Sequence, residues 1–284
     1  MKTRSENQSR AKGPALDAVT FHKLRERITA ASGIYIAEDE NSRFILERRL
    51  LPRLRVRGLT SFSDYESAID EKEMEAVLDM VAIHETYFFR EKRQLLAFSE
   101  HILPELASMS QPLRIWSAGC STGEEAYTIA MLLSERGMLQ GGHVQLIASD
   151  LSRRVVESAV RGIYGASSFR TTGTHYQKKY FHEAGRGLWA ASEMLRSSVQ
   201  FEQFNLIDLS ERLNGKAARD RFDVIFCRNV LMYFDEYAAK KTLRAFHSLL
   251  KKGGYLLLGH AESLLPLGTA FEPVQIGREL VHRK

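Results

Sequence analysis

Residues 116–127 read Trp-Ser-Ala-Gly-Cys-Ser-Thr-Gly-Glu-Glu-Ala-Tyr, and this stretch constrains the fold more than any other part of the chain. An apolar run at residues 113–117 predicts a buried strand, and the pattern from Glu124 to Arg136 predicts a helix with one apolar face. Glycines between the two elements let the backbone approach a ligand closely. A strand, a small-residue turn and an acidic helix start together predict a pocket for a cationic nucleoside.

Apolar strands alternate with helices from residue 113 onward, which is the pattern of an α/β fold with a doubly wound, mostly parallel sheet. The predicted strands are 113–117, 144–149, 199–204, 223–227 and 255–259. A helix that starts at Asp235 is expected to stop at the glycine pair 253–254. The runs 271–276 and 279–282 are too close together to enclose a helix, so we expect a terminal antiparallel hairpin.

The chain divides into four predicted regions. They are a disordered tail (1–15), an all-helical domain (16–90), a linker helix (91–112) and the α/β domain (113–284). The linker helix is expected to kink at Pro104. Residues 165–197 are too long for a simple connection, and we expect them to form a small antiparallel lobe around a turn near residues 185–187.

Charge and cysteine content limit the classes of protein to which this chain can belong. The net charge of +5 and the isoelectric point near 9.1 fit nucleic acid, a membrane surface or an acidic protein partner. Cys120 and Cys227 lie far apart without a metal-binding pattern, so we expect neither a disulfide framework nor a zinc site. Apolar runs stay short of the ~18 residues that a membrane span needs. The sequence therefore predicts a cytoplasmic protein.

Arginines crowd one short part of the predicted helical domain. Residues 43–57 carry six arginines against a single glutamate. On a helix, Arg49, Arg53 and Arg57 recur every four residues and share a face. Pro52 is expected to kink that helix. The stripe predicts either a docking face for an acidic partner or a solvated basic face.

Two glutamates at the start of the helix that follows residue 117 indicate the charge of the ligand. Glu124 and Glu125 lie where the pyrophosphate of a dinucleotide would meet the helix, and they would repel it. The spacing of the glycines also differs from the dinucleotide motif. A sulfonium cofactor with an amino-acid tail matches better. The alternative is that both glutamates only complement the helix dipole.

Polar residues also follow three other predicted strands. Asp150 ends the second strand, where a carboxylate can accept both hydroxyls of a ribose or can cap the next helix. Asn205 follows the third strand, and Arg228 and Asn229 follow the fourth. Open α/β sheets bind ligands at the carboxyl ends of their strands, so these side chains are candidates for one site.

Six motifs give the chain a family likeness. They are His84-Glu85-Thr86-Tyr87-Phe88-Phe89-Arg90-Glu91, Ser117 to Glu125, Ala148-Ser149-Asp150, Phe226-Cys227-Arg228-Asn229-Val230, Tyr233-Phe234-Asp235 and Gly259-His260-Ala261-Glu262. Together they closely resemble the chemotaxis receptor methyltransferases, the CheR family, from about residue 20 to residue 284.

The resemblance implies a fold and a reaction. In that family an all-helical domain precedes a class I S-adenosylmethionine-dependent methyltransferase domain, which is Rossmann-like and carries a small β lobe. A methyl group passes from S-adenosylmethionine to glutamate side chains of chemoreceptors, which are methyl-accepting chemotaxis proteins. The products are glutamate methyl esters, used in sensory adaptation, and S-adenosylhomocysteine.

The resemblance also assigns site residues. Cofactor contacts are implied for His84, Thr86, Arg90, Glu125, Asp150, Asn205, Leu206, Arg228 and Asn229. His84 stands where asparagine is usual in the family, and an imidazole can still donate one hydrogen bond. Arg90 and Tyr233 are implied to lie near the transferred methyl group as catalytic residues. The residues implied to dock on receptor helices are Arg49, Arg53, Arg55 and Arg57.

A glutamate acceptor needs no general base, because its pKa near ~4.3 makes it a carboxylate at neutral pH. The expected partner is the glutamate-rich cytoplasmic helical domain of a receptor. We expect the protein to be a monomer that binds no nucleic acid and no metal and does not insert into a membrane. Two alternatives stay open. One is a signalling module that binds S-adenosylmethionine without turnover, and the other is a methyltransferase of another protein or of RNA.

Overall fold

The computed structural model describes residues 14–107, 112–139, 142–209, 221–264 and 267–284. The chain divides into two compact units. The helical unit holds the described residues up to Ala30 together with Ile36–Val81, and the larger unit holds Ala31–Tyr35 and Ala82–Lys284. Residues 82–90 thus lie with the larger unit, whereas the predicted helical domain extends to residue 90.

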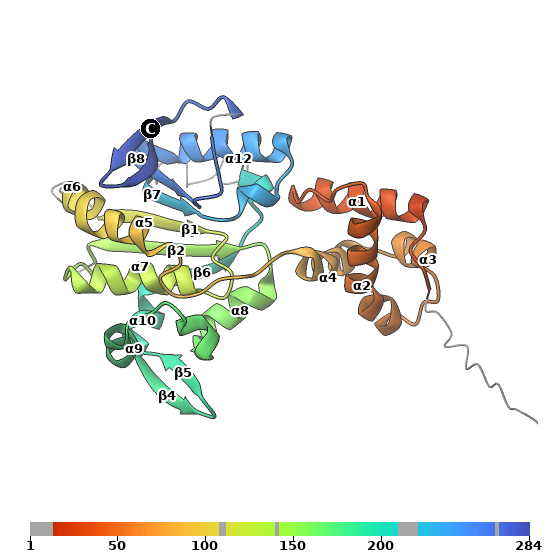
Figure 1. The fold of residues 1–284 in the computed structure, drawn as a ribbon, viewed down its shortest axis with the longest axis horizontal. Coiled ribbons are helices and arrows are strands. Elements are labelled where there is room, and N and C mark those ends of the chain that lie inside the picture. Colours follow the sequence, from red (N-terminus) through yellow and green to blue (C-terminus); the bar gives the residue numbers. More distant parts are fainter. Residues whose placement is uncertain (1–13, 108–111, 140–141, 210–220, 265–266) are drawn as a thin grey trace, which may run out of the picture. The chain divides into compact units, whose positions relative to one another are not determined.

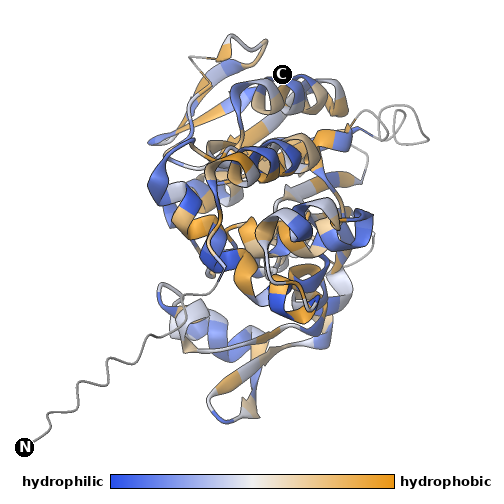
Figure 2. Cartoon of the chain, turned by 90° about the vertical axis from the view of Figure 1, so that its right-hand side faces the viewer, coloured by the Kyte–Doolittle hydropathy of each residue, from blue (hydrophilic) through white to orange (hydrophobic). Residues whose placement is uncertain are grey.

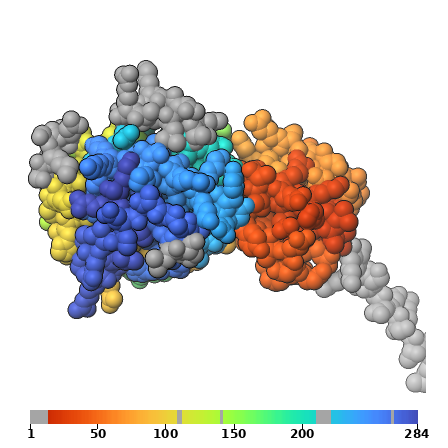
Figure 3. All heavy atoms as spheres, turned by 90° about the horizontal axis from the view of Figure 1, so that it is seen from above, coloured from red at the N-terminus to blue at the C-terminus, as the bar shows by residue number. Residues whose placement is uncertain are grey.

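Four helices form the helical unit, and Figure 3 shows its residues, from red to orange, as one compact body. They are α1 (Ala18–Ser32), α2 (Glu40–Val56), α3 (Phe62–Ser67) and α4 (Glu71–Val81). The side chain of Asp39 caps α2, and that of Ser61 caps α3. Each cap accepts a hydrogen bond from a backbone N–H that has no partner within its helix.

The core of the helical unit is built from side chains of all four helices. Its buried side chains include Leu24, Ile28, Leu46, Leu50, Leu54, Phe62, Tyr65 and Val77. Phe44 and Ile45 of α2 are exposed. They share the opposite side of α2 from Leu46 and Leu50. The α2 helix runs continuously through Pro52.

A seven-stranded sheet forms the centre of the larger unit, in the order β6-β2-β1-β7-β8-β10-β9 (Figure 1). The strands are β1 (Leu113–Ala118), β2 (Val144–Asp150), β6 (Val199–Gln203), β7 (Phe222–Cys227), β8 (Leu250–Leu258), β9 (Glu272–Ile276) and β10 (Glu279–Arg283). The first five pair in parallel, and β9 and β10 form the antiparallel hairpin that the sequence predicted. The carboxyl ends of β1, β2 and β7 therefore meet at one edge of the sheet.

Helices cover both faces of the sheet (Figure 1). On one face are α5 (Lys92–Ala97), α6 (Leu103–Ala107) and α7 (Glu124–Glu135), joined in the core by residues of α10 (Glu193–Ser198). On the other face is α12 (Glu236–Leu249). The helix α8 (Arg153–Arg161) follows β2. Blue and orange alternate along these helices in Figure 2, as expected for elements with one buried side.

The inserted lobe is a small antiparallel sheet with its own helices. Its strands are β3 (Ile163–Tyr164), β4 (Phe181–Gly185) and β5 (Leu188–Ala191), with β5 in the middle. Its helices are η2 (Ala166–Phe169) and α9 (Thr174–Tyr180). The turn between β4 and β5 lies at the predicted position, because Gly185 pairs with Leu188.

Two helix predictions are wrong in detail. The helix before β8 ends at Leu249, and the glycine pair 253–254 lies inside β8, where the pairing with β7 shifts register. The linker helix is three segments, since a π-helical turn, η1 (Phe98–Ile102), separates α5 from α6. Pro104 explains this turn, because a proline lacks the N–H that would continue regular α-helical bonding.

The predicted end of the linker helix, at residues 108–111, lies outside the described residues. Across the described ranges, every helix is too short or too polar to cross a membrane.

Candidate functional site

The turn after β1 is wrapped tightly around the end of β2. The amides of Gly119 and Cys120 donate to the carbonyl oxygen of Ser149 at 2.8 and 2.9 Å, and the amide of Ser121 donates to Oδ2 of Asp150 at 2.8 Å. Gly119 has a φ of +85°, and a Cβ there would come within 2.4 Å of a methyl carbon of Val230. Only glycine fits this position, so the turn brings three strand ends together.

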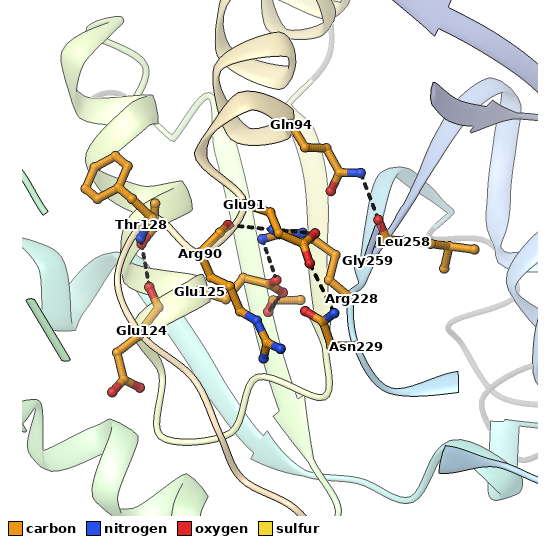
Figure 4. A network of polar contacts seen from close by, with 12 residues as sticks. Arg90, Glu91, Gln94, Glu124, Glu125, Thr128, Arg228, Asn229, Leu258 and Gly259 are labelled. Atoms are coloured by element: carbon orange, nitrogen blue, oxygen red, sulfur yellow. Dashed lines mark hydrogen bonds and ion pairs between the residues drawn. The ribbon is translucent and has the colours of Figure 1, made fainter. Parts of the chain in front are cut away.

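Arg228 is the centre of the site, as Figure 4 shows. Its Nη1 donates to Oε2 of Glu125 at 3.1 Å, and its Nη2 donates to Oε2 of Glu91 at 3.2 Å. The same Nη2 donates to the carbonyl oxygen of Arg90. The side chain of Arg228 is only 2% exposed, so these contacts replace water almost completely. A guanidinium suits this role because its donors diverge in a fixed plane.

The two carboxylates beside Arg228 have opposite pKa shifts. Burial raises the pKa of Glu125, against the opposing charge of Arg228 and a 2.7 Å hydrogen bond from the hydroxyl of Ser117. Burial would also raise the pKa of Glu91, but the charge of Arg228 and a hydrogen bond from Asn229 outweigh it and leave that pKa below its usual value. Of these two carboxylates, Glu125 is thus held less firmly in its charged form.

A third carboxylate, Glu262, shapes the loop after β7. It accepts hydrogen bonds from the backbone amides of Gly259, Asn229, Val230 and Met232, at 2.6, 2.7, 2.9 and 3.1 Å. Burial raises the pKa of Glu262, while these amides act in the opposite direction. Glu262 therefore holds the loop in the conformation that presents Asn229.

Backbone strain gathers around this network. Phe89, Glu91, Ser121 and Asn229 all have a φ between +51° and +59°, although none of them is glycine. Such conformations cost about 1 kcal/mol or more each and persist where the surroundings impose them. Four of the five such residues in the described chain lie at the strand ends or in the segment that joins them, and the fifth is Arg186 in the lobe turn. Their concentration here indicates a functional site.

Several buried polar atoms of the site have no hydrogen-bond partner among the described residues. They are Nε of Arg228, Oδ1 of Asn229 and Nε2 of His84. A buried polar atom without a partner costs about 1–3 kcal/mol, a cost that a bound ligand would remove. These donors and acceptors fit a ligand with several polar groups.

The segment 84–91 supplies the outer wall of the site. The carbonyl oxygen of His84 accepts a hydrogen bond from the hydroxyl of Ser121 at 3.0 Å, which ties the segment to the turn after β1. Arg90 donates from Nη1 to the carbonyl oxygen of Glu85 at 2.7 Å, and its guanidinium forms no ion pair within the described ranges. The hydroxyl of Thr86 likewise makes no hydrogen bond to a described residue. Arg90 thus keeps most of its donors available.

Tyr233 is positioned by its backbone. It ends a short 3-10 helix, η5 (Leu231–Tyr233), just after the loop that Glu262 holds. Its carbonyl oxygen accepts a 2.7 Å hydrogen bond from the amide of Tyr35, whose segment, Ala31–Tyr35, belongs to the larger unit. Its ring is partly exposed.

The remaining residues of the predicted cofactor site occupy varied environments. Asp150 accepts from the amides of Ser121 and Ser152, and Ser152, not Asp150, caps the following helix α8. Asn205 caps η3 (Leu206–Asp208) with its oxygen and donates from Nδ2 to the carbonyl oxygen of Ala31 at 2.8 Å. The side chain of Leu206 is buried in the core. Asp150 therefore faces the turn after β1, whereas Asn205 and Leu206 brace the neighbouring loop.

Glu124 points away from this network. Its carboxylate accepts hydrogen bonds from the hydroxyls of Thr122 and Ser168, at 2.6 and 2.9 Å. Burial raises the pKa of Glu124 above its usual value. Glu124 thus joins the start of α7 to the inserted lobe, while Glu125 alone of the pair faces Arg228.

Three residues of this site were not identified from the sequence. Glu91 and Glu262 lie within the family motifs but had no predicted role, and Gln94 lies outside those motifs. Gln94 is buried and donates to the carbonyl oxygen of Leu258 at 2.8 Å, which joins α5 to the end of β8. A signal existed for Glu262, since an acidic residue shortly after a strand and a glycine is suited to bind backbone amides.

The predicted docking arginines lie mostly against the inside of their own unit. Arg53 donates from Nε and Nη2 to the carboxylate of Glu73 at 2.9 and 2.6 Å, and Arg57 approaches the same carboxylate at 3.4 Å. Arg49 donates to the carbonyl oxygen of Val81. These three arginines share one face of α2, as the spacing predicted, and that face packs on α4. Arg55 is exposed and forms no ion pair with a described residue.

Comparisons with known proteins match this architecture. Residues 84–279 match the family model of the CheR methyltransferase SAM-binding domain, and residues 20–81 match that of the CheR methyltransferase all-alpha domain. The "Chemotaxis protein methyltransferase 2" of Vibrio cholerae is 33% identical, with 88% of each chain covered. The "Chemotaxis protein methyltransferase 1" of Pseudomonas aeruginosa is 32% identical over 93% of this chain and 97% of that relative. The "Chemotaxis protein methyltransferase" of Borreliella burgdorferi is 34% identical over 79% of this chain and 82% of that relative.

The strand order, the terminal hairpin and the site at the strand ends define a class I S-adenosylmethionine-dependent methyltransferase. The chain belongs to the CheR family of methyltransferases. Its cofactor is S-adenosylmethionine, and the carboxylates and unpaired polar atoms at the strand ends fit a ligand with a positive sulfonium, an amino-acid group and a ribose.

Proposed function

We propose that this protein transfers methyl groups from S-adenosylmethionine to glutamate side chains of chemoreceptors and forms glutamate methyl esters. It is then a protein-glutamate O-methyltransferase that acts as a monomer in the cytoplasm on the helical domains of receptors. The names of its relatives support the substrate. The observation that carries the proposal is the Arg228 network, a buried and incomplete set of polar groups in a chain of this family.

Most of the proposed cofactor residues surround this network. S-adenosylmethionine supplies a methyl group on a positively charged sulfur. Glu125 and Asp150 would accept hydrogen bonds from it at two neighbouring strand ends, and Asn229 would use its unpaired oxygen. Arg228 would act through Glu125, which it holds in place. His84, Thr86 and Arg90 would close the site from segment 84–91, and Asn205 and Leu206 would close it from the loop after β6.

The proposed acceptor is already a nucleophile. A glutamate carboxylate is charged at neutral pH, so the protein has to align it and exclude water rather than remove a proton. Attack on a sulfonium methyl destroys two charges, and a site that excludes water favours such a reaction. The proposed reaction therefore needs no catalytic base.

Arg90 and Tyr233 are the proposed residues that orient the acceptor. Arg90 has donors available for an acceptor, since among the described residues its side chain makes a single hydrogen bond, to the carbonyl oxygen of Glu85. Replacement by Arg90→Ala should lower kcat about tenfold or more, the effect of one lost hydrogen bond to a charged group. Arg93→Ala, an exposed arginine three residues away, is the matched control. An unchanged kcat at saturating acceptor would remove Arg90 from the mechanism.

Transfer of a labelled methyl group to receptor fragments tests the function itself. We expect base-labile label on fragments that contain glutamate and none on fragments with alanine in its place. A protein that binds S-adenosylmethionine tightly but labels nothing would be a binding module instead. Label on RNA or on unrelated proteins under the same conditions would identify another substrate class.

We also propose that the arginines of residues 49–57 dock on the receptor, and that Arg55 contributes most. Charge reversal at Arg53 or Arg57 would also disturb Glu73, so it cannot report on docking alone. Arg55→Glu avoids this problem, and it should raise the KM for the receptor at low salt and leave cofactor affinity unchanged. Equal KM values for the variant and the wild type would leave the stripe without a docking role.

A further inference from the structure

Three large apolar or aromatic side chains are exposed next to Tyr233. Tyr35 is 57% exposed, Met232 is 49% exposed and Tyr237 is 74% exposed. Met232 precedes Tyr233 in η5, and Tyr237 lies in the first turn of α12. We call these three residues the Tyr35 surface. Large exposed apolar groups that gather at one place mark an interaction site more often than scattered ones do.

Backbone pairing fixes Tyr35 beside Tyr233. The amide of Tyr35 donates to the carbonyl oxygen of Tyr233 at 2.7 Å, and the amide of Asp235 donates to the carbonyl oxygen of Gly33 at 2.9 Å. Ile34 and Phe234 therefore form the bridge of a short antiparallel ribbon, and Tyr35 stands opposite Tyr233. Side chains that stand opposite each other in such a ribbon share a face, with their Cβ atoms about 5 Å apart.

The other face of the ribbon is anchored in the protein. Phe234 packs against the core beneath α12. Gly33 has a φ of +76°, and a Cβ there would come within 2.7 Å of the Cβ of Ala238. Tyr35 is exposed and Tyr233 is partly exposed, so both side chains lie on the outer side of this pairing. The position of Tyr35 is therefore set by the fold and not by a flexible loop.

The acidic groups beside the Tyr35 surface already have partners. Asp235 caps α12 through the amide of Ala238 at 2.7 Å. Glu236 pairs with Lys240 one turn further along α12. The surface therefore offers apolar contact rather than free negative charge, so it would not repel an acidic acceptor and would recognise it by its apolar residues.

We propose that the Tyr35 surface binds the apolar side of the acceptor helix, next to the glutamate that receives the methyl group. This inference rests on the proposed function. On a helix, residues three or four positions apart lie about 5–6 Å from each other, which matches the spacing of Tyr35 and Tyr233. A glutamate that reaches Tyr233 thus places the side chain one turn away on Tyr35. Acceptor sites should carry apolar residues one turn from the modified glutamate.

Replacement of the aromatic rings tests the proposal in the full-length protein. Tyr35→Ser and Tyr237→Ser should each raise the KM for a receptor fragment about five- to tenfold, the effect of removing one aromatic anchor from an interface. The kcat and the affinity for S-adenosylhomocysteine should stay at wild-type values. Tyr35→Phe should restore the wild-type KM, since the ring and not the hydroxyl makes the contact.

Two controls separate the surface from its alternatives. Val160→Ser alters another exposed apolar side chain of the same unit, 54% exposed on α8, and should leave the KM unchanged. Added salt up to about 0.5 M should leave the ratio of KM values between each serine variant and the wild type unchanged, because salt screens the charges of the docking arginines and leaves apolar burial intact. Wild-type KM values for both serine variants, or a ratio that falls to one in salt, would overturn the inference.

The outcome also distinguishes this inference from the proposed function. If the wild-type protein labels receptor fragments and the serine variants do so with the same KM, the methyl transfer stands and the Tyr35 surface is excluded. If the wild-type protein labels no receptor fragment, the proposed function fails first. Unchanged binding of S-adenosylhomocysteine shows that a variant with a raised KM is folded.

Discussion

The helical unit and the larger unit each pair an arginine with glutamate, and the two clusters differ in how complete they are. In the helical unit, Arg53 donates twice to Glu73, and the hydroxyl of Tyr65 donates to the same carboxylate at 2.6 Å. In the larger unit, Arg228 joins two carboxylates, but its Nε has no partner among the described residues. One cluster is closed, and the other is open.

Backbone geometry shows the same contrast. Arg53 and Glu73 lie within regular helices, α2 and α4, so local structure already favours their conformations. Glu91 and Asn229 have left-handed backbone conformations that only their surroundings impose. A closed cluster on regular helices acts as a brace, whereas an open cluster on strained loops fits a ligand-binding site.

Loss of the cluster around Glu73 should have the largest effect, a loss of stability. Glu73→Ala leaves the hydroxyl of Tyr65 buried without its acceptor and removes the partner of Arg53 and Arg57. We expect a loss of about 3 kcal/mol in the unfolding free energy of the helical unit, at the low end for a broken buried pair because both arginines can turn toward water. Denaturant unfolding followed by circular dichroism measures it.

A matched substitution on the same helix sharpens this test. Glu75 is exposed on α4, and Glu75→Ala should change the stability by less than about 0.5 kcal/mol. Glu73→Ala should also leave the affinity for S-adenosylhomocysteine unchanged. A loss of cofactor affinity equal to that of a site variant would break the distinction between the brace and the site.

Arg228→Lys should have the second largest effect, a loss of affinity for the cofactor. A lysine keeps the charge but cannot reach Glu125 and Glu91 with a planar fork. We expect the affinity for S-adenosylmethionine to drop at least about tenfold, the size of one lost charge-assisted hydrogen bond. Calorimetry with the cofactor measures the drop, and Arg154→Lys, at an exposed position of α8, is the control. Wild-type affinity in Arg228→Lys would mean that the network does not position Glu125.

The contrast between the clusters also explains what the sequence could predict. Glu125, Asp150 and Arg228 were predictable because strand period and parallel pairing place their backbones at one edge of the sheet. The parallel sheet, the terminal hairpin and the lobe turn followed from apolar runs and glycine positions in the same way.

Contacts that depend on how separate loops meet were not predictable. Glu262 binds amides of residues some thirty positions earlier in the chain, and no periodic pattern carries that pairing. The orientation of the arginine face toward α4 depends on where Glu73 lies after packing. The four left-handed residues of the site likewise result from tertiary contacts.

Glu262→Gln should have a smaller effect than Arg228→Lys, since the amide keeps one acceptor oxygen. Its NH2 group would face backbone amides that need an acceptor, so the loop should shift around Asn229. We expect a loss of about 1 kcal/mol, or roughly fivefold, in cofactor affinity. Glu272→Gln, on the exposed side of β9, should have no effect. Because Glu262 only positions others, an effect on kcat without any change in cofactor affinity would contradict its assigned role.

Acidification should give the smallest and most selective difference between the clusters. Burial raises the pKa of Glu125, so this carboxyl gains its proton above the ordinary glutamate value of 4.5 as the pH falls. Burial acts on Glu73 as well, but the hydrogen bonds from Arg53 and Tyr65 outweigh it and leave its pKa below 4.5. A carboxyl with a lowered pKa in the folded state contributes stability above its unfolded pKa, and this contribution is lost only as the pH falls through the lowered value. Between neutral pH and 4.5 the affinity for S-adenosylhomocysteine should therefore fall by a few fold, while circular dichroism of the helices stays unchanged. Glu125→Gln should bind more weakly at neutral pH and lose this pH dependence, and a variant that keeps the wild-type profile would assign the titration to another group.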